Sequence, residues 1–131
     1  MIYLLDVNAL VALGFVNHEF HERVSRWIQS SRPLQLATCA ITELGFIRVL
    51  SQAMAYGLTV AQARTLLLRL KRVRGSPLTF IADGHDVSYL PGWVNAPKQI
   101  TDGHLSELAD AHGALLATLD ENIPSSFIIP R

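Results

Sequence analysis

The stretch Ile2–Leu13, IYLLDVNALVAL, decides the fold of this chain. Four apolar residues, 2–5, run directly into the carboxylate of Asp6, and Asn8 opens a second apolar run with helical spacing. The first run predicts a buried strand, and residues 8–14 predict a short helix. A carboxylate at such a junction needs an explanation, because a charge is costly to bury without a partner.

The rest of the chain alternates between the same two patterns. Helices are expected at 18–31, 41–54, 60–73 and 102–112, and strands at 34–38, 78–82, 114–118 and 126–130. Prolines and glycines interrupt residues 83–99, where we expect one short helix and loops. Strands that alternate with helices predict an α/β sandwich on a mainly parallel sheet. The uninterrupted apolar strands indicate that helices cover both faces of that sheet.

Length and composition indicate a single globular domain spanning residues 1–131. Half of the residues are hydrophobic and 17% are charged, which is typical of a protein with a large core. No apolar run approaches the ~20 residues that a membrane span requires, and the N-terminus lacks the basic region of a signal peptide. A lone cysteine, Cys39, fits a reducing compartment, and we expect a cytoplasmic protein in which Cys39 is a small buried side chain.

The charges are balanced overall but unevenly placed. Eleven basic and eleven acidic residues give a net charge of zero, which argues against a general polyanion binder. Five of the eleven bases lie in the segment 64–74, RTLLLRLKRVR, at positions Arg64, Arg69, Lys71, Arg72 and Arg74. This segment is either the solvated face of an amphipathic helix or a patch that contacts phosphates, and the sequence leaves both interpretations open.

Four acids stand where a ligand crevice is expected. Asp6 and Asp120 each follow a predicted strand, and ligands of open α/β sheets bind at the carboxyl ends of the strands. Glu43 and Asp102 lie in the first turns of their helices, where a carboxylate alone needs no ligand to explain it. Four carboxylates facing one crevice would repel one another unless a cation were present, and oxygen ligands of this kind suit Mg²⁺ or Mn²⁺.

Other catalytic patterns are weaker or missing. The sequence contains no G-x-S-x-G, no G-x-x-x-x-G-K-[ST] and no G-x-G-x-x-G. His18 and His21 lie three apart on one face of a predicted helix, but HEFH lacks the H-E-x-x-H spacing of a zinc site, so structural or solvated histidines are expected. Trp93 is expected to be a packing residue.

Three segments together resemble the PIN domain, and in particular the VapC toxins of bacterial toxin–antitoxin pairs. They are LLDVNAL at 4–10, ITELGFIRVL at 41–50 and QITDGHLSELADAHGALLATLDENI at 99–123, in the order and spacing of that family. The resemblance implies a three-layer α/β sandwich with a parallel five-stranded sheet between helices. It also implies a Mg²⁺-dependent ribonuclease, usually endonucleolytic on structured RNA such as tRNA, and a cognate antitoxin as partner.

Carried over residue by residue, the resemblance assigns the acidic metal site to Asp6, Glu43, Asp102 and Asp120. Asn8 and Thr118 match the small polar residues that support this site. Around it we expect RNA to be held by basic residues, namely Arg48, Arg64, Arg69, Lys71, Arg72 and Arg74. The pair Asp120-Glu121 is more acidic than the family pattern and leaves the number of metal ions open.

Assembly is predicted from the apolar content of two helices. The helix with Phe46, Ile47 and Leu50, together with 60–73, carries more apolar surface than one small core needs. We therefore expect a homodimer, and an antitoxin segment lying over exposed apolar helices.

Two alternatives to the ribonuclease remain at this stage. Phosphatases of the haloacid dehalogenase type also place an aspartate after the first strand. They require a second aspartate where this chain has Asn8 and a later basic residue, for which Lys98 stands in the wrong context. The other alternative is a non-catalytic PIN scaffold that binds RNA or protein, against which the presence of all four acids argues.

Overall fold

The computed structural model describes residues 1–31, 33–73 and 77–131, and its centre is a sheet in which all neighbouring strands run parallel. Its five strands are β1 (Ile2–Leu5), β2 (Gln35–Cys39), β3 (Leu78–Ile81), β4 (Ala114–Thr118) and β5 (Phe127–Ile128). They lie in the order β3-β2-β1-β4-β5, so β1 is the central strand and both of its neighbours flank it over most of its length.

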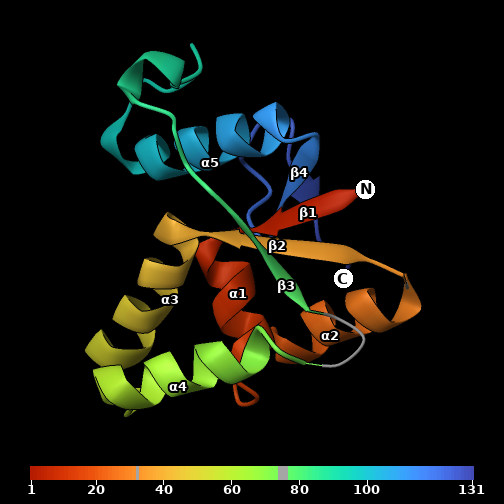
Figure 1. Cartoon of the computed structure of the whole chain (residues 1–131), viewed down its shortest axis with the longest axis vertical. Helices are drawn as coiled ribbons and strands as arrows, with labels where there is room; N and C mark the ends of the chain where they lie inside the picture. The colour runs from red at the N-terminus through yellow and green to blue at the C-terminus, as the bar shows by residue number, and fades with distance from the viewer. Residues whose placement is uncertain (32, 74–76) are drawn as a thin grey trace.

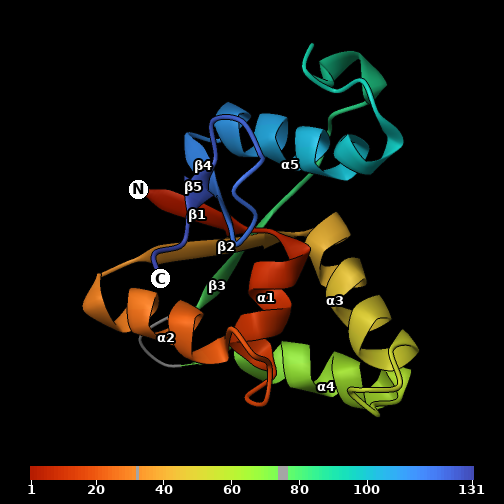
Figure 2. The same ribbon diagram turned by 180° about the vertical axis from the view of Figure 1, so that it is seen from behind.

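Helices cover both faces of this sheet, as Figures 1 and 2 show. On one side lie α1 (Val7–Gly14), α2 (His21–Ser30), α3 (Ala40–Gln52) and α4 (Val60–Leu70). On the other side lies α5 (Ile100–Ala111), together with the loop segment that precedes it. The predicted three-layer α/β sandwich with a parallel five-stranded sheet is therefore confirmed.

Alternating side chains of β1 supply the two cores. Leu5 points into the core under α1–α4, and Leu4 points into the core under α5, where it packs with Leu105 and Leu108. Phe46 and Leu50 are completely buried in the first core. They are therefore not available for an interface, and the sequence argument that counted them as surplus apolar surface was wrong on this point.

Two polar residues cap the N-terminal ends of helices. Asp6 is the N-cap of α1, and its Oδ1 accepts a hydrogen bond of 2.8 Å from the backbone N–H of Ala9. Thr59 caps α4 as predicted, in a reciprocal pair of hydrogen bonds with Gln62. After α5, Gly113 adopts a φ of +65°, which lets the chain turn directly into β4.

Several predicted boundaries differ from the structure. Helix α2 begins at His21 rather than at residue 18, because His18 lies in a turn where its Nδ1 accepts a hydrogen bond from the N–H of Phe20. Residues 83–99 hold two short 3-10 helices, η1 (Val87–Tyr89) and η2 (Pro97–Gln99), instead of one helix. No helix in the described ranges is long and apolar enough to cross a membrane.

Candidate functional site

The parallel register brings the ends of the two central strands together. Asp6 directly follows β1 and Asp120 lies two residues beyond β4, while Leu5 is paired with Ala117 in the sheet. Asp102 stands in the first turn of α5. The charges of both Asp102 and Asp120 raise the pKa of Asp6, so these three carboxylates lie close enough to repel one another.

Asp6 is the most strongly perturbed of the three acids. Its side chain is buried, with only 6% of the residue exposed. Burial raises the pKa of Asp6 to about 6, and the neighbouring charges of Asp102 and Asp120 add to that effect. Hydrogen bonds from Thr118 and Ala9 act in the opposite direction without cancelling it. The charged form of this carboxylate is destabilised, and a cation bound beside it would stabilise that form.

Thr118 links the two strand ends through one hydroxyl group. Its Oγ1 donates to Oδ2 of Asp6 at 2.6 Å and accepts from the backbone N–H of Asp120 at 2.9 Å. Since Thr118 is completely buried, this geometry is fixed by the surrounding core. Asn8, the other supporting residue named from the sequence, is exposed and lines a surface hollow of about 410 Å³ together with Asp120.

Asp102 lies close enough to Asp120 for the charge of Asp120 to act on it. Burial raises the pKa of Asp102, and the charge of Asp120 raises it further. None of the ion pairs between described residues includes Asp6, Asp102 or Asp120. The three aspartates are therefore a cluster of like charge without a cationic side chain of their own.

Glu43, the fourth acid named from the sequence, has a different environment. Its Oε2 accepts a hydrogen bond of 2.5 Å from Thr38 and lies 2.7 Å from Nζ of Lys71. Glu43 is not among the charges that shift the pKa of Asp6 or of Asp102. The structure thus groups Asp6 with the other two aspartates and pairs Glu43 with a lysine.

Of the basic residues predicted to hold RNA, Arg48 lies on α3, Arg64 and Arg69 lie on α4, and Lys71 and Arg72 follow the end of α4 at Leu70. Four of them are exposed, namely Arg48, Arg64, Arg69 and Arg72, and no ion pair of the described residues involves any of these. Arg69 and Arg72 line one surface hollow of about 410 Å³ with Thr65 and Leu68. Lys71 is half-buried against Glu43, and Arg74 lies outside the described residues.

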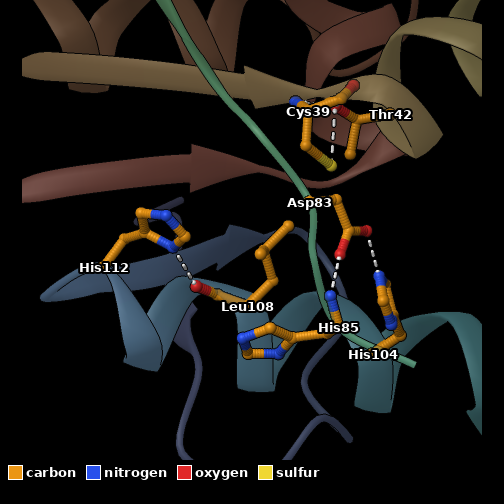
Figure 3. Close-up of polar contacts among 7 residues, drawn as sticks. All are labelled: Cys39, Thr42, Asp83, His85, His104, Leu108 and His112. Carbon is orange, nitrogen blue, oxygen red and sulfur yellow. Dashed lines mark hydrogen bonds and ion pairs between the residues drawn. The ribbon is translucent and has the colours of Figure 1, made fainter. Parts of the chain in front are cut away.

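One polar pair near this edge was missed by the sequence analysis. Asp83, which follows β3, contacts Nε2 of His104 on α5 and accepts a hydrogen bond of 2.9 Å from the N–H of His85 (Figure 3). Although burial alone raises the pKa of Asp83, these hydrogen bonds and the histidine charges hold it below its usual value. The strand-end rule that identified Asp6 and Asp120 applies to Asp83 too and could have found it.

The remaining candidates from the sequence have structural roles. Cys39 is completely buried, and Thr42 donates to its Sγ at 3.8 Å (Figure 3). Nδ1 of His21 lies within hydrogen-bond distance, 2.7 Å, of the carbonyl oxygen of Ala12. His18 lies before the start of α2, so the two histidines do not share a helix face. Trp93 packs against the core under α5, as expected.

The donor set fits a hard divalent cation bound with few direct protein ligands. Within residues 1–31, 33–73 and 77–131, no three His, Cys, Asp or Glu side chains are arranged to hold a metal ion as they stand. Mg²⁺, however, is usually bound by only one or two carboxylates and keeps several waters. The mutual repulsion within the aspartate cluster is the observation that favours such a cation, because the cation relieves it.

Comparisons with known proteins identify the family. The model of the PIN domain matches residues 3–125. Ribonuclease VapC38 of Mycobacterium tuberculosis is 38% identical over 127 residues, which cover 92% of this chain and 86% of that protein. Among solved structures, VapC20 of Mycobacterium tuberculosis, described as a Sarcin-Ricin loop cleaving toxin, aligns with a TM-score of 0.66 at 12% identity over 98% of each chain. VapBC2 from Rickettsia felis, bound to a DNA fragment from its promoter, aligns with a TM-score of 0.62 at 18% identity, covering 98% of this chain and 97% of that one.

Proposed function

Since the chain belongs to the PIN domain family, we propose that it is a Mg²⁺-dependent endoribonuclease of the VapC type, the toxin of a toxin–antitoxin pair. Relatives that bear the name ribonuclease VapC support the reaction class, and they align over more than nine-tenths of this chain. Mn²⁺ has the same preference for oxygen ligands and would substitute for Mg²⁺.

The observation that carries this proposal is the convergence of Asp6, Asp102 and Asp120 at one edge of the sheet without a cationic side chain among the described residues. Asp6, Asp102 and Asp120 would hold a divalent cation there, which would supply an activated water and would neutralise the charge that builds on the phosphate oxygens. No protein nucleophile is then needed, which agrees with a sequence that lacks the common nucleophile motifs.

The chain's own residues orient this site before substrate arrives. The backbone of α1 and the hydroxyl of Thr118 each hold one oxygen of Asp6, so the direction of its carboxylate is fixed. The same hydroxyl accepts from the N–H of Asp120 and ties the loop after β4 to β1. Hydrogen bonds that orient a metal-binding carboxylate are typically worth about 10- to 100-fold in affinity or activity.

RNA binding is assigned to basic side chains around the acids. An acidic site repels RNA except where a cation is bound, so affinity must come from elsewhere. Exposed arginines that make no described ion pair, such as Arg48, Arg69 and Arg72, support this role. Arg64 is exposed as well, whereas Arg74 stays a prediction from the sequence. Structured RNA such as tRNA also stays a prediction.

A cognate antitoxin is the partner that the VapC relatives and the VapBC structures support. Exposed apolar residues on and beside α3 and α4 offer a surface for it, including Leu44 at 60% and Leu68 at 46% exposure. The homodimer and the cytoplasmic location stay predictions.

The phosphatase alternative loses support at Asn8. This residue is exposed on the first turn of α1, and the position that needs a second aspartate in that class holds an amide. The non-catalytic scaffold is disfavoured by the cost of keeping Asp6 buried among like charges, because a protein that bound no cation would gain by losing them.

The test is cleavage of a fluorescently labelled tRNA mixture by the full chain, first treated with EDTA and then assayed with and without Mg²⁺. We expect cleavage only with Mg²⁺, and a loss of about 1,000-fold or more in Asp102→Asn, since the charge that binds the cation is removed. Asp110→Asn is the matched control, because Asp110 is an exposed aspartate on the same helix.

Full cleavage in excess EDTA would refute the metal-dependent mechanism. Equal cleavage by Asp102→Asn and Asp110→Asn would refute the assigned site. Release of phosphate from p-nitrophenyl phosphate with no cleavage of RNA would favour the phosphatase instead.

A further inference from the structure

The proposed cleavage leaves a surface hollow beside the aspartate cluster without a role. Its volume is about 410 Å³, within the range of about 300–1,000 Å³ that is typical of small-molecule sites. Asp120 of the aspartate cluster lines it together with the segment that joins α1 to α2. The lining residues are Asn8, His18, Glu19, Phe20, Leu119 and Asp120. A group bound in this hollow therefore lies next to a carboxylate of the candidate site.

Phe20 offers an aromatic surface in this hollow. The residue is 37% exposed, yet its position is fixed by its neighbours. Its N–H donates to Nδ1 of His18 at 3.0 Å, and the ring centroids of these two residues are 5.9 Å apart. The guanidinium carbon of Arg23 lies 5.8 Å from the centroid of Phe20, and Nε of Arg23 donates to the carbonyl of Ile129 at 3.0 Å. An aromatic ring that is held in place and still exposed suits the stacking of an unpaired base.

The polar side chains of the hollow suit a nucleobase better than a phosphate. Glu19 and Asp120 are carboxylates, and neither takes part in an ion pair of the described ranges. Among the residues that the structure describes, no lysine or arginine lines the hollow. Burial lowers the pKa of His18, which favours its neutral ring. These carboxylates repel a phosphate, whereas a base is neutral and carries N–H donors that a carboxylate accepts.

We propose that this hollow binds one unpaired base of the RNA, on a nucleotide next to the scissile phosphate, and that it prefers guanine. The inference rests on the proposed ribonuclease function and assigns a specificity pocket to the same site. The base stacks on Phe20, and the carboxylate of Glu19 accepts hydrogen bonds from its N–H groups. The amide of Asn8 has both donors and an acceptor for the remaining polar atoms of the base.

Guanine is the base whose hydrogen-bonding groups match Glu19 best. Its ring N–H and its exocyclic amino group lie side by side on the Watson–Crick edge, so one carboxylate accepts from both. Adenine and cytosine present an amino group beside a ring acceptor, which a carboxylate repels, and uracil presents one N–H between two carbonyl oxygens. A bidentate contact of this kind typically discriminates between bases by about 5- to 150-fold.

The first experiment measures which bases flank the cut. An RNA hairpin with a loop of random unpaired nucleotides is cleaved by the full chain in Mg²⁺, and sequencing of the products gives the base frequencies beside the cut. The parent should prefer guanine about tenfold or more at one position. Glu19→Gln should lose most of this preference, because an amide accepts only at its oxygen and cannot take both N–H groups.

Variants of Phe20 test the stacking. Phe20→Leu keeps an apolar side chain without an aromatic ring, and it should raise KM for a guanine-containing hairpin about tenfold. Its kcat should be nearly unchanged, since the ring contributes binding and touches no reacting atom. Phe20→Trp should retain the KM of the parent. Tyr89→Leu is the matched control, because Tyr89 is a 50% exposed aromatic residue on η1 and does not line the hollow. Thermal unfolding verifies that each variant is folded.

A binding measurement separates this inference from the proposed function. Guanosine and uridine are titrated separately into the isotope-labelled parent in EDTA, and the backbone amide signals of Glu19, Phe20 and Asp120 are followed by NMR. Guanosine should shift these signals, and uridine should shift them much less. Such binding without any cleavage of RNA would support the base pocket and refute the ribonuclease.

Three results would each overturn the inference while cleavage itself still supported the proposed function. They are the absence of a guanine preference in the parent or its full retention in Glu19→Gln, a KM of Phe20→Leu equal to that of Tyr89→Leu, and amide signals that guanosine does not shift.

Discussion

The aspartate cluster and the Glu43–Lys71 pair lie at the same end of one parallel sheet, yet their charges are balanced differently. Asp6 is buried among two other aspartates, and its pKa is raised to about 6. Glu43 is half-buried and contacts an ammonium group at 2.7 Å. In both regions the acids lie where a strand ends or a helix begins at this edge of the sheet. The two regions differ in charge balance because a lysine side chain reaches Glu43 and no cationic side chain of the described residues pairs with the aspartates.

This difference indicates which region requires something from outside the protein. The aspartates keep an unfavourable arrangement that a bound cation relieves, and a strained site of this kind is where function is expected. The Glu43–Lys71 pair is complete by itself. It requires no cation from outside the protein, whereas the aspartates form the part that would bind one under the proposed function.

The largest expected effect comes from removing the charge of Asp6. Asp6→Asn should lower RNA cleavage by about 1,000-fold or more, because the site then loses a buried negative charge that binds the cation. The measurement is single-turnover cleavage of labelled tRNA in Mg²⁺. Asp110→Asn, at an exposed aspartate on α5, is the control. Cleavage within a few-fold of the parent would remove Asp6 from the site.

Thr118 offers the next largest effect. Thr118→Val should lower cleavage by about 10- to 100-fold, because Asp6 loses a hydrogen-bond donor and the N–H of Asp120 loses its acceptor. Leaving buried polar groups without partners should also lower the free energy of unfolding by about 1–3 kcal/mol. Thr118→Ser keeps the hydroxyl and should retain most activity. Equal activity of the valine and serine variants would show that the hydroxyl does not position Asp6.

A smaller effect is expected from two exposed arginines, Arg69 in the last turn of α4 and Arg72 just beyond it. Reversing both Arg69 and Arg72 to Glu should weaken RNA binding and flatten its dependence on salt. Each lost phosphate contact changes the slope of log K against log salt by about 0.7 to 0.9. Fluorescence anisotropy with labelled tRNA at several salt concentrations measures this slope. Mn²⁺ affinity should change little, and an unchanged slope would mean that this face is only solvated.

A separate effect, on stability and not on activity, concerns the dependence of stability on pH in the absence of metal. The pKa of Asp6 is about 6 in the folded chain and 3.8 for an ordinary aspartate, so the folded state binds the proton more tightly. Its contribution to stability is therefore lost as pH rises from about 4 to about 6, on the order of 3 kcal/mol.

Comparison of the parent with Asp6→Asn isolates this contribution, since all other groups titrate in both proteins. Denaturant unfolding in EDTA at pH 4, 5, 6 and 7 should show the parent losing stability relative to the variant over this range. A constant difference would mean that the pKa of Asp6 is not raised.

Much of the candidate site could be predicted from sequence because it follows from backbone rules. Asp6 and Asp120 were found by their position after apolar strands, and Asp102 by its place in the first turn of a helix. The same rules place Asp83 after β3, and it was overlooked because its partner, His104, lies 21 residues away on α5.

The contacts of Glu43 could not be found in this way. Lys71 lies in a basic segment that the sequence could describe only as a whole, and nothing in its spacing distinguishes it from Arg69 or Arg72. Lys71 directly follows α4, and its carbonyl accepts a hydrogen bond of 3.4 Å from the N–H of Leu78 in β3, while its ammonium group contacts Glu43 of α3. Such a pairing depends on tertiary packing, which periodicity does not encode.

The position of bound metal tests the proposed site most directly. Crystals of the full chain grown with Mn²⁺, at a concentration that supports RNA cleavage, should give one anomalous difference peak per chain, recorded at the manganese absorption edge. The account predicts that the protein oxygens nearest to this peak belong to Asp6, Asp102 or Asp120, with Lys71 still on Glu43. The absence of a peak at the aspartates, or a peak at Glu43 alone, would contradict it.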